Sequence, residues 1–208
     1  METDAPGLYL ITPPIPDWTP YGALFEKVIP ACGLACLLIR TAASDEAGKA
    51  YILGALIPLA QEHGVACLVE DDPQLAILVN ADGVHVNGEG PLLESSVRLL
   101  KPGRIAGAGG LRTRHAAMAA GEAGADYVLF GGSGEPHANI AGRVSWWAEL
   151  FTVPCVGYAH DLGSIGDLVR AGADFIALGD AVFADPRGAK AALCEAQMRI
   201  NETAGPAR

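Results

Sequence analysis

The sequence contains few basic residues and few aromatic ones. It has 14 Lys and Arg residues against 24 Asp and Glu residues, a formal net charge of −10, and 6% aromatic residues. Nucleic acids and anionic membranes are bound through basic patches that neutralise phosphates, so we expect neither as a partner. A small anionic ligand remains compatible with this charge, because one local pocket of arginines and backbone N–H groups can hold it.

Targeting signals and membrane spans are lacking as well. The first twenty residues contain five prolines and no basic start, which is unlike a signal peptide. The longest apolar stretch, residues 28–39, is interrupted by Pro30 and Gly33, so nothing approaches a membrane span. The five cysteines include no CxxC pair, and Cys67 and Cys155 fall in expected strands. We therefore expect a cytoplasmic protein with reduced, buried thiols.

A repeated strand pattern is what the sequence does contain. Residues 81–87, 125–130 and 173–178 each begin with Ala-Asp and continue into mostly β-branched or aromatic apolar residues. The two later copies are spaced by the length of two strand-helix units. Such repetition in 208 residues predicts an α/β protein with a single (β/α)8 TIM barrel as its one domain. Within residues 1–208, we expect residues 1–7 and 203–208 to be frayed.

Eight strands can be placed from the apolar runs and the Gly and Pro residues that bound them. They are expected at residues 8–12, 35–40, 65–69, 83–86, 104–106, 125–130, 155–158 and 173–178. Helices are expected between them, including residues 44–63, 92–100, 143–150 and 186–201. Residues 131–137, Gly-Gly-Ser-Gly-Glu-Pro-His, show neither helical nor strand character and are a candidate lid.

Polar residues gather where the expected strands end, and in a barrel these ends share one face. They are Arg40, Glu70, Asp71, Asp72, Glu89, Arg112, Arg114, His137, His160, Asp161 and Asp180. The Gly-rich turn at residues 107–110 leads to Arg112 and is typical of a phosphate site. Two interpretations stay open, because these glycines could instead serve only close packing while the arginines are solvated.

Three further groups at this face suggest chemistry. The acidic residues 70–72 could hold Mg²⁺ or could simply favour a helix start. His137 and His160 lie on loops and are candidates for acid/base catalysis, with Asp161 able to orient one of them. His85 lies within a strand, which favours a structural role. All four lysines fall in expected helices, which argues against a Schiff-base aldolase.

The chain resembles the thiamine phosphate synthase and thiazole tautomerase family. The resemblance is carried by residues 8–12, the acidic end of strand three, and residues 81–86, 124–131 and 172–177. It implies a (β/α)8 barrel that joins hydroxymethylpyrimidine diphosphate to thiazole phosphate and releases pyrophosphate, with Mg²⁺ on the diphosphate. Cations are needed around the leaving group, because negative charge builds there as the bond breaks.

The resemblance assigns roles to individual positions. Of a Gln-x-Arg-x-Lys motif that grips the diphosphate, Arg40 remains, and the metal-binding Asp after strand three is Asp71. The second metal-binding Asp corresponds to Gly90, with Glu89 beside it. We expect Asp71 and Glu89 as metal ligands, and expect substrate binding at Arg40, Gly109, Gly110, Arg112, Gly131, Gly132 and Gly179.

Other family positions differ in this chain. The Thr-rich loop after strand six is replaced by residues 132–137, a Gly-Gly phosphate turn by Ala159-His160, and a Ser by Asp180. The tautomerase histidine corresponds to Gly132. A carboxylate aimed into a phosphate pocket opposes binding of the anion. These differences indicate a divergent member with eroded active-site motifs.

Three functions therefore remain open. The first interpretation is a phospho-ligand-binding homologue in or near thiamine metabolism without full synthase activity. The first alternative is an active thiamine phosphate synthase-type transferase, and the second is a tautomerase or isomerase that uses His137 or His160. In each case the partner is a small phosphorylated molecule, and a homo-oligomer is compatible with the sequence.

Overall fold

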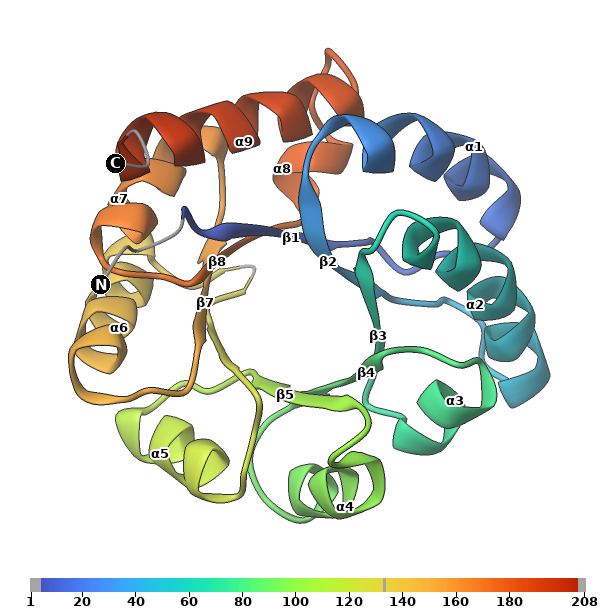
Figure 1. Ribbon diagram of the computed structural model, residues 1–208, viewed down its shortest axis with the longest axis horizontal. Coiled ribbons are helices and arrows are strands. Elements are labelled where there is room, and N and C mark those ends of the chain that lie inside the picture. Colours follow the sequence, from blue (N-terminus) through green and yellow to red (C-terminus); the bar gives the residue numbers. More distant parts are fainter. Residues whose placement is uncertain (1–4, 133, 206–208) are drawn as a thin grey trace.

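The computed structural model describes residues 5–132 and 134–205, which form a closed barrel of eight parallel strands in sequence order (Figure 1). The strands are β1 (Gly7–Ile11), β2 (Leu34–Ile39), β3 (Ala66–Glu70), β4 (Gly83–Asn87), β5 (Ile105–Gly109), β6 (Val128–Phe130), β7 (Cys155–Ala159) and β8 (Phe175–Leu178). Both faces of a parallel strand are buried in such a fold, which explains the nearly continuous apolar runs. The predicted (β/α)8 TIM barrel is confirmed.

Helices surround the barrel and cover the outer face of its strands (Figure 1). They are α1 (Trp18–Val28), α2 (Glu46–Gln61), α3 (Pro73–Leu78), α4 (Pro91–Leu100), α5 (Arg114–Glu122), α6 (His137–Leu150), α7 (Ile165–Arg170), α8 (Asp180–Phe183) and α9 (Ala189–Ala204), with 3₁₀ turns at Ile29–Ala31 and Leu162–Ser164. Side-chain oxygens of Asp17, Asp72 and Thr113 accept first-turn N–H groups and so fix where α1, α3 and α5 begin. No helix among the described residues is both long and apolar enough to cross a membrane.

Two apolar clusters hold the barrel together. The larger one lies between strands and helices and contains most of the buried aliphatic side chains, together with Phe25 and Trp147. The smaller one fills the barrel and consists of Tyr9, Cys36, Leu38, Leu68, Tyr127, Leu129, Val156, Tyr158 and Ala177. Cys67 and Cys155 are buried and unpaired, as expected, and burial raises the pKa of each thiol to about 12.

The repeated Asp residues clasp neighbouring strands together. In each copy the carboxylate accepts a hydrogen bond from a backbone N–H of the adjacent strand, and the carbonyl of that same residue accepts one from the Asp N–H. The pairs are Asp82 with Cys67, Asp126 with Ala106, and Asp174 with Cys155, at N···O distances of 2.7 to 2.9 Å. The seams between β3 and β4, β5 and β6, and β7 and β8 are therefore each locked in register at their amino-terminal end.

The seam between β1 and β2 is different because it contains a bulge. Leu8 pairs with Leu34, but Tyr9 pairs with Cys36, so Ala35 is an extra residue on β2. Leu34 packs in the outer cluster, whereas Cys36 packs inside the barrel only two residues later. One extra residue thus reverses the alternation of side chains from this point onward.

Some boundaries differ from those expected from the sequence. Helix α6 begins at His137 instead of near residue 143, since the Pro136 carbonyl already accepts the N–H groups of Asn139 and Ile140. Gly7 and Thr203, expected in frayed tails, belong to β1 and α9, where the Gly7 N–H donates to the Asp174 carbonyl. The expected tail residues 1–4 and 206–208, and residue 133 of the candidate lid, lie outside the described residues.

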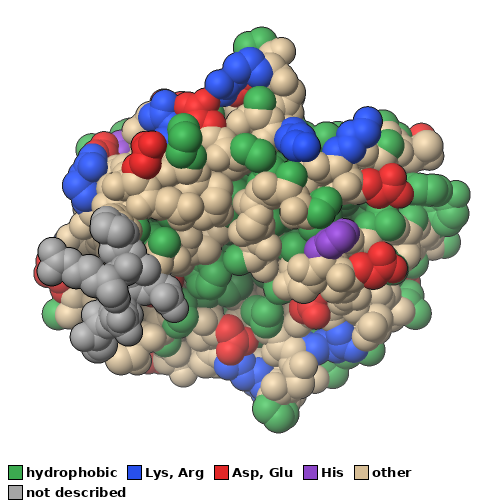
Figure 2. Space-filling model, turned by 45° about the horizontal axis from the view of Figure 1, so that its top comes forward, with side chains coloured by type: hydrophobic (Ala, Val, Ile, Leu, Met, Phe, Trp, Pro, Cys, Tyr) green, Lys and Arg blue, Asp and Glu red, His purple; other side chains and the backbone are tan. Residues whose placement is uncertain are grey.

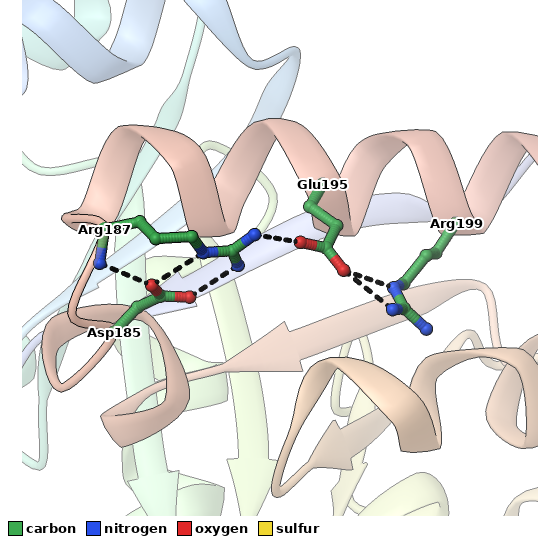
Figure 3. Close-up of polar contacts among 4 residues, drawn as sticks. All are labelled: Asp185, Arg187, Glu195 and Arg199. Atoms are coloured by element: carbon green, nitrogen blue, oxygen red, sulfur yellow. Dashed lines mark hydrogen bonds and ion pairs between the residues drawn. The ribbon is translucent and has the colours of Figure 1, made fainter.

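Several surface cations are used in ion pairs. At the start of α9, the Arg187 guanidinium donates to Asp185 and to Glu195, and Arg199 donates to the other oxygen of Glu195 (Figure 3). The guanidinium of Arg187 lowers the pKa of the Asp185 carboxyl to about 2. On the face seen in Figure 2, Lys and Arg side chains are interspersed with Asp and Glu. This network joins the segment before α9 to the helix.

The reciprocal hydrogen bonds of the repeated Asp residues should contribute measurably to stability. We expect Asp82→Ala to lower the free energy of unfolding by about 2 kcal/mol, because it leaves the buried Cys67 N–H without its charged acceptor. Urea denaturation monitored by circular dichroism measures this change. Asp45→Ala is the matched control, since Asp45 precedes α2 without a side-chain cap hydrogen bond, and should change stability by less than about 0.5 kcal/mol. Equal effects of both substitutions would contradict the assigned role.

Candidate active site

A cavity of about 550 Å³ opens at the carboxyl ends of the strands. Its floor is apolar and includes Ile11, Leu38 and Leu129, while polar side chains line its rim. Of the residues expected to bind substrate, six line this cavity: Arg40, Gly110, Arg112, Gly131, Gly132 and Gly179. The strand ends therefore converge as the sequence predicted, and we call this space the mouth cavity.

Arg40 is held in the mouth cavity by Thr12, which follows β1, and by Glu70 at the end of β3. Its backbone N–H donates to Thr12 Oγ1 at 2.9 Å, and its Nε lies 3.3 Å from the Glu70 carboxylate. Asn87 Nδ2 donates to the second Glu70 oxygen at 3.1 Å. The Arg40 side chain remains 38% exposed. A ligand in the cavity can therefore approach the guanidinium, which Glu70 orients.

Asp71 lies beside this group at a left-handed turn with a φ of 53°. Its two carboxylate oxygens accept hydrogen bonds from the backbone and the side-chain amide of Asn87, at 2.7 and 3.0 Å. Glu89, the other expected metal ligand, is exposed in the turn between β4 and α4. Within residues 5–132 and 134–205, no three His, Cys, Asp or Glu side chains are grouped to hold a metal. Mg²⁺ often takes only one or two carboxylates and completes its shell with water and substrate phosphates, so Asp71 still fits such an ion.

A column of aromatic side chains leads from the mouth cavity into the barrel. His85 lines the cavity, its Nδ1 lies 2.6 Å from Tyr127 Oη, and Tyr127 Oη lies 3.0 Å from Tyr9 Oη. Burial lowers the pKa of His85 to about 4, although the nearby Asp71 carboxylate partly opposes the shift. Burial also raises the pKa of both tyrosines. All three groups are consequently neutral at physiological pH.

The glycines of β5 make room for this column. A Cβ atom at Gly107 would lie 2.0 Å from the Tyr127 ring, and one at Gly109 would lie 2.3 Å from His85 Nε2. Gly109 therefore contacts His85 and does not line the mouth cavity, whereas Gly110 and Arg112 do. Gly107 and Gly109 thus serve close packing, as the second interpretation of this turn expected. Gly110 and Arg112 face the cavity, where the first interpretation placed a phosphate.

The two histidines expected to be acid/base groups do not line the mouth cavity. His137 opens α6 and its Nε2 lies 3.2 Å from Asp167 Oδ2 on α7. His160 Nε2 lies 2.6 Å from the Glu135 carbonyl oxygen. Asp161 caps the 3₁₀ turn after β7 and does not orient either ring in this arrangement. The His137 ring instead joins α6 to α7, and the His160 ring joins the end of β7 to the β6–α6 loop.

The β6–α6 loop is anchored on its other side as well. Glu135 Oε1 accepts a hydrogen bond from Arg143 Nη2 at 2.5 Å, and Arg143 Nη1 donates to the Leu111 carbonyl at 2.7 Å. The candidate lid is thus joined to α6 and to the loop after β5. Tyr158 and Asn139 also line the mouth cavity and were not singled out from the sequence. Tyr158 follows Gly157 within a strand and carries no local signal that sets it apart from a core residue.

Comparison with known proteins identifies the family. A sequence model described as thiamine monophosphate synthase matches residues 8–182. The chain belongs to the thiamine monophosphate synthase family. It is 36% identical to the thiamine-phosphate synthase of Rhodospirillum centenum, over 90% of this chain and 94% of that protein. It is 34% identical to that of Hyphomonas neptunium, over 89% of this chain and 90% of that protein.

Solved structures share the fold of this chain. The thiamine phosphate pyrophosphorylase of Pyrococcus furiosus superposes with a TM-score of 0.80 at 23% identity, covering 96% of this chain and 97% of that one. A 3-hexulose-6-phosphate synthase superposes with a TM-score of 0.74 at 15% identity, covering 93% and 99%. The curated relatives favour our first alternative, an active synthase, over the first interpretation of a homologue without full activity.

The buried histidine predicts how stability depends on pH. The folded pKa of His85 is about 4 and the unfolded value is 6.5, so between these pH values the unfolded chain binds a proton that the folded chain does not. Stability should therefore fall as pH drops from 6.5 to 4, by roughly 2 to 3 kcal/mol from this group. Urea denaturation at each pH measures the slope. His85→Asn should flatten it, while His115→Gln, at an exposed histidine of α5, should not. A slope unchanged by His85→Asn would contradict a neutral His85.

Proposed function

We propose that this protein is a thiamine phosphate synthase that joins hydroxymethylpyrimidine diphosphate to thiazole phosphate. The observation that carries the proposal is the placement of Arg40 at the rim of the mouth cavity, beside Asp71 and Asn87. This is the position to which the family resemblance assigns the diphosphate grip. Relatives named thiamine-phosphate synthase, aligned over about nine-tenths of the chain, support the same reaction.

The cavity suits two phosphorylated heterocycles. Its apolar floor of Ile11, Leu38 and Leu129 offers a surface on which flat rings can pack, and its polar rim meets the phosphates. In the reaction, the thiazole nitrogen bonds to the pyrimidine methylene carbon while the carbon–oxygen bond to the diphosphate breaks. The bonding electron pair leaves with pyrophosphate, where the Arg40 guanidinium opposes the growing negative charge.

Asp71 is the residue that would hold Mg²⁺ in this site. The ion would neutralise the charge of the diphosphate, with the rest of its coordination from phosphate oxygens and water. Asn87 contributes by fixing both oxygens of the Asp71 carboxylate. Neither Glu89 nor Asp71 lines the mouth cavity. The Asp71 carboxylate is hydrogen-bonded to Asn87, which does line it, so Asp71 is the better candidate of the two expected ligands.

A second function, phospho-ligand binding without full synthase activity, is favoured by one observation. Three carboxylates, Glu70, Glu135 and Asp180, line the mouth cavity together with two guanidinium groups, Arg40 and Arg112. This excess of negative charge opposes a triply charged leaving group more than it opposes a single phosphate. The tautomerase alternative is not proposed, because neither His137 nor His160 lines the cavity.

Direct assay separates these functions. With both precursors and Mg²⁺, we expect the protein to form thiamine phosphate, and Arg40→Gln to lower kcat/KM by at least about a hundredfold, since it removes a charge at the leaving group. Product formation is followed by chromatography. Arg98→Gln is the matched control, because Arg98 is an exposed arginine of α4 paired only with Glu94.

The negative outcomes are also informative. Wild-type protein that forms no thiamine phosphate would overturn the proposed synthase. If thiazole phosphate or thiamine phosphate then still raises the melting temperature of that protein, the second function is supported instead. Equal kcat/KM values for Arg40→Gln and Arg98→Gln would show that Arg40 does not grip the diphosphate.

A further inference from the structure

A second hollow of about 340 Å³ adjoins the mouth cavity between α5 and α6. Its polar lining residues are Arg112, Arg114, Arg143, Glu135 and Asn139. We call it the basic hollow. Arg112, Glu135 and Asn139 line both spaces, so the basic hollow is continuous with the rim of the mouth cavity. A ligand bound at the rim can therefore extend into it.

The two spaces differ in charge. The basic hollow combines three guanidinium groups with the single carboxylate of Glu135, a formal charge of +2. The mouth cavity combines two guanidinium groups with three carboxylates, a formal charge of −1. In a chain with a net charge of −10, such a local cluster is where an anion is attracted. By formal charge, the basic hollow therefore attracts phosphate more strongly than the mouth cavity does.

Arg143 gives the basic hollow a buried, preorganised cation. The residue is 8% exposed, and its two terminal nitrogens are fixed by Glu135 and the Leu111 carbonyl. Its Nε is buried without a hydrogen-bond partner in residues 5–132 and 134–205. Burial of a guanidinium with one N–H unsatisfied is costly, and a nearby anion lowers that cost. Glu135 formally neutralises Arg143, so the positive charge left in the basic hollow is that of Arg112 and Arg114.

Arg112 and Arg114 supply the accessible charges. Both are exposed, and in the described parts of the chain neither is paired with a carboxylate. The Arg114 guanidinium lies 4.8 Å from the centre of the Trp146 ring on α6, which restrains its position. Thr113 caps α5 between them, so N–H groups of the first helical turn lie at the same place. Two guanidinium forks and a helix start together suit a compact polyanion.

We propose that the basic hollow binds a diphosphate group, through Arg112 and Arg114 with Arg143 behind them. This inference rests on the proposed function, because the synthase substrate carries a diphosphate and its product is pyrophosphate. The site would supply the cations that the end of β2 provides only through Arg40. Pyrophosphate leaving the pyrimidine would then pass from the negatively charged mouth cavity to the positively charged basic hollow.

Binding of inorganic pyrophosphate to the whole protein tests this site without requiring turnover. By isothermal titration calorimetry at low salt, we expect Arg112→Gln and Arg114→Gln each to raise the pyrophosphate Kd at least tenfold, since each loses a charged hydrogen-bond donor. Arg98→Gln, which removes the same charge from α4, should leave the Kd unchanged. Equal pyrophosphate affinities in the wild type, Arg112→Gln, Arg114→Gln and Arg98→Gln would overturn the proposed site. An affinity that is lost only in Arg40→Gln would overturn it as well.

A substitution in the opposite direction strengthens the test. Glu135→Gln removes the carboxylate that competes for Arg143 while keeping a hydrogen-bond acceptor of the same shape. We expect pyrophosphate to bind this variant several-fold more tightly than wild type, with the difference shrinking at high salt. Weaker or unchanged binding in a variant whose circular dichroism is native would contradict the role given to Glu135.

The two proposals fail in different ways. If the protein makes no thiamine phosphate but binds pyrophosphate in a manner that depends on Arg112 and Arg114, the synthase proposal is rejected and the diphosphate site stands. If thiamine phosphate is formed but the pyrophosphate Kd does not change in Arg112→Gln or Arg114→Gln, the synthase proposal stands and the proposed diphosphate site is rejected.

Discussion

The reciprocal hydrogen bonds of the repeated Asp residues are the constraint on which the barrel depends. Each carboxylate fixes the register of one strand pair at the amino-terminal end, where the helices enter the strands. Register then determines which side chains face inward for the whole length of the strand. At the opposite, carboxyl-terminal end, the Asp71 carboxylate accepts the Asn87 N–H, and the neighbouring Arg40, Glu70 and Asn87 line the mouth cavity. The three repeated Asp contacts thus lie at the end of the barrel opposite the site.

Scarcity of positive charge is the second constraint. Of the 14 basic residues, several are already paired on the surface, as Arg187 and Arg199 are at α9 (Figure 3). Arg40 and Arg112 reach the mouth cavity, and Arg114 and Arg143 lie just beyond it. In a protein of this composition a polyanion is attracted most where the arginines are concentrated, and in this chain they are concentrated around the starts of α5 and α6. The ion pair between Glu135 and Arg143 has two effects. It fixes the β6–α6 loop, and it neutralises part of the positive charge of the basic hollow.

The sequence was sufficient for the barrel because its signals are periodic and local. Strand runs, the Ala-Asp repeat and helix caps each involve a few neighbouring residues, and all eight strands were found within a few positions of their place. The site was harder, because what a side chain touches depends on packing between distant segments. Gly107 and Gly109 resemble a phosphate turn in sequence, yet the reason for two of these glycines is the bulk of Tyr127 and His85 arriving from other strands. His137 and His160 were expected on two loops as acid/base candidates, but His137 opens α6 and both rings are engaged by neighbouring segments.

The bulge in β2 has an effect beyond its own position. Before it, the strand directs Leu34 toward the helices, and after it the same parity directs Cys36 and Leu38 into the barrel. Arg40 inherits that direction, so its guanidinium emerges on the ligand side of the wall instead of among the aliphatic residues that α1 and α2 cover. A regular strand of the same length that kept Leu34 among the helices would place Arg40 on the helix side as well. The residue type alone therefore does not equip this chain for anions, because the bulge upstream sets the side of the wall on which the charge lies.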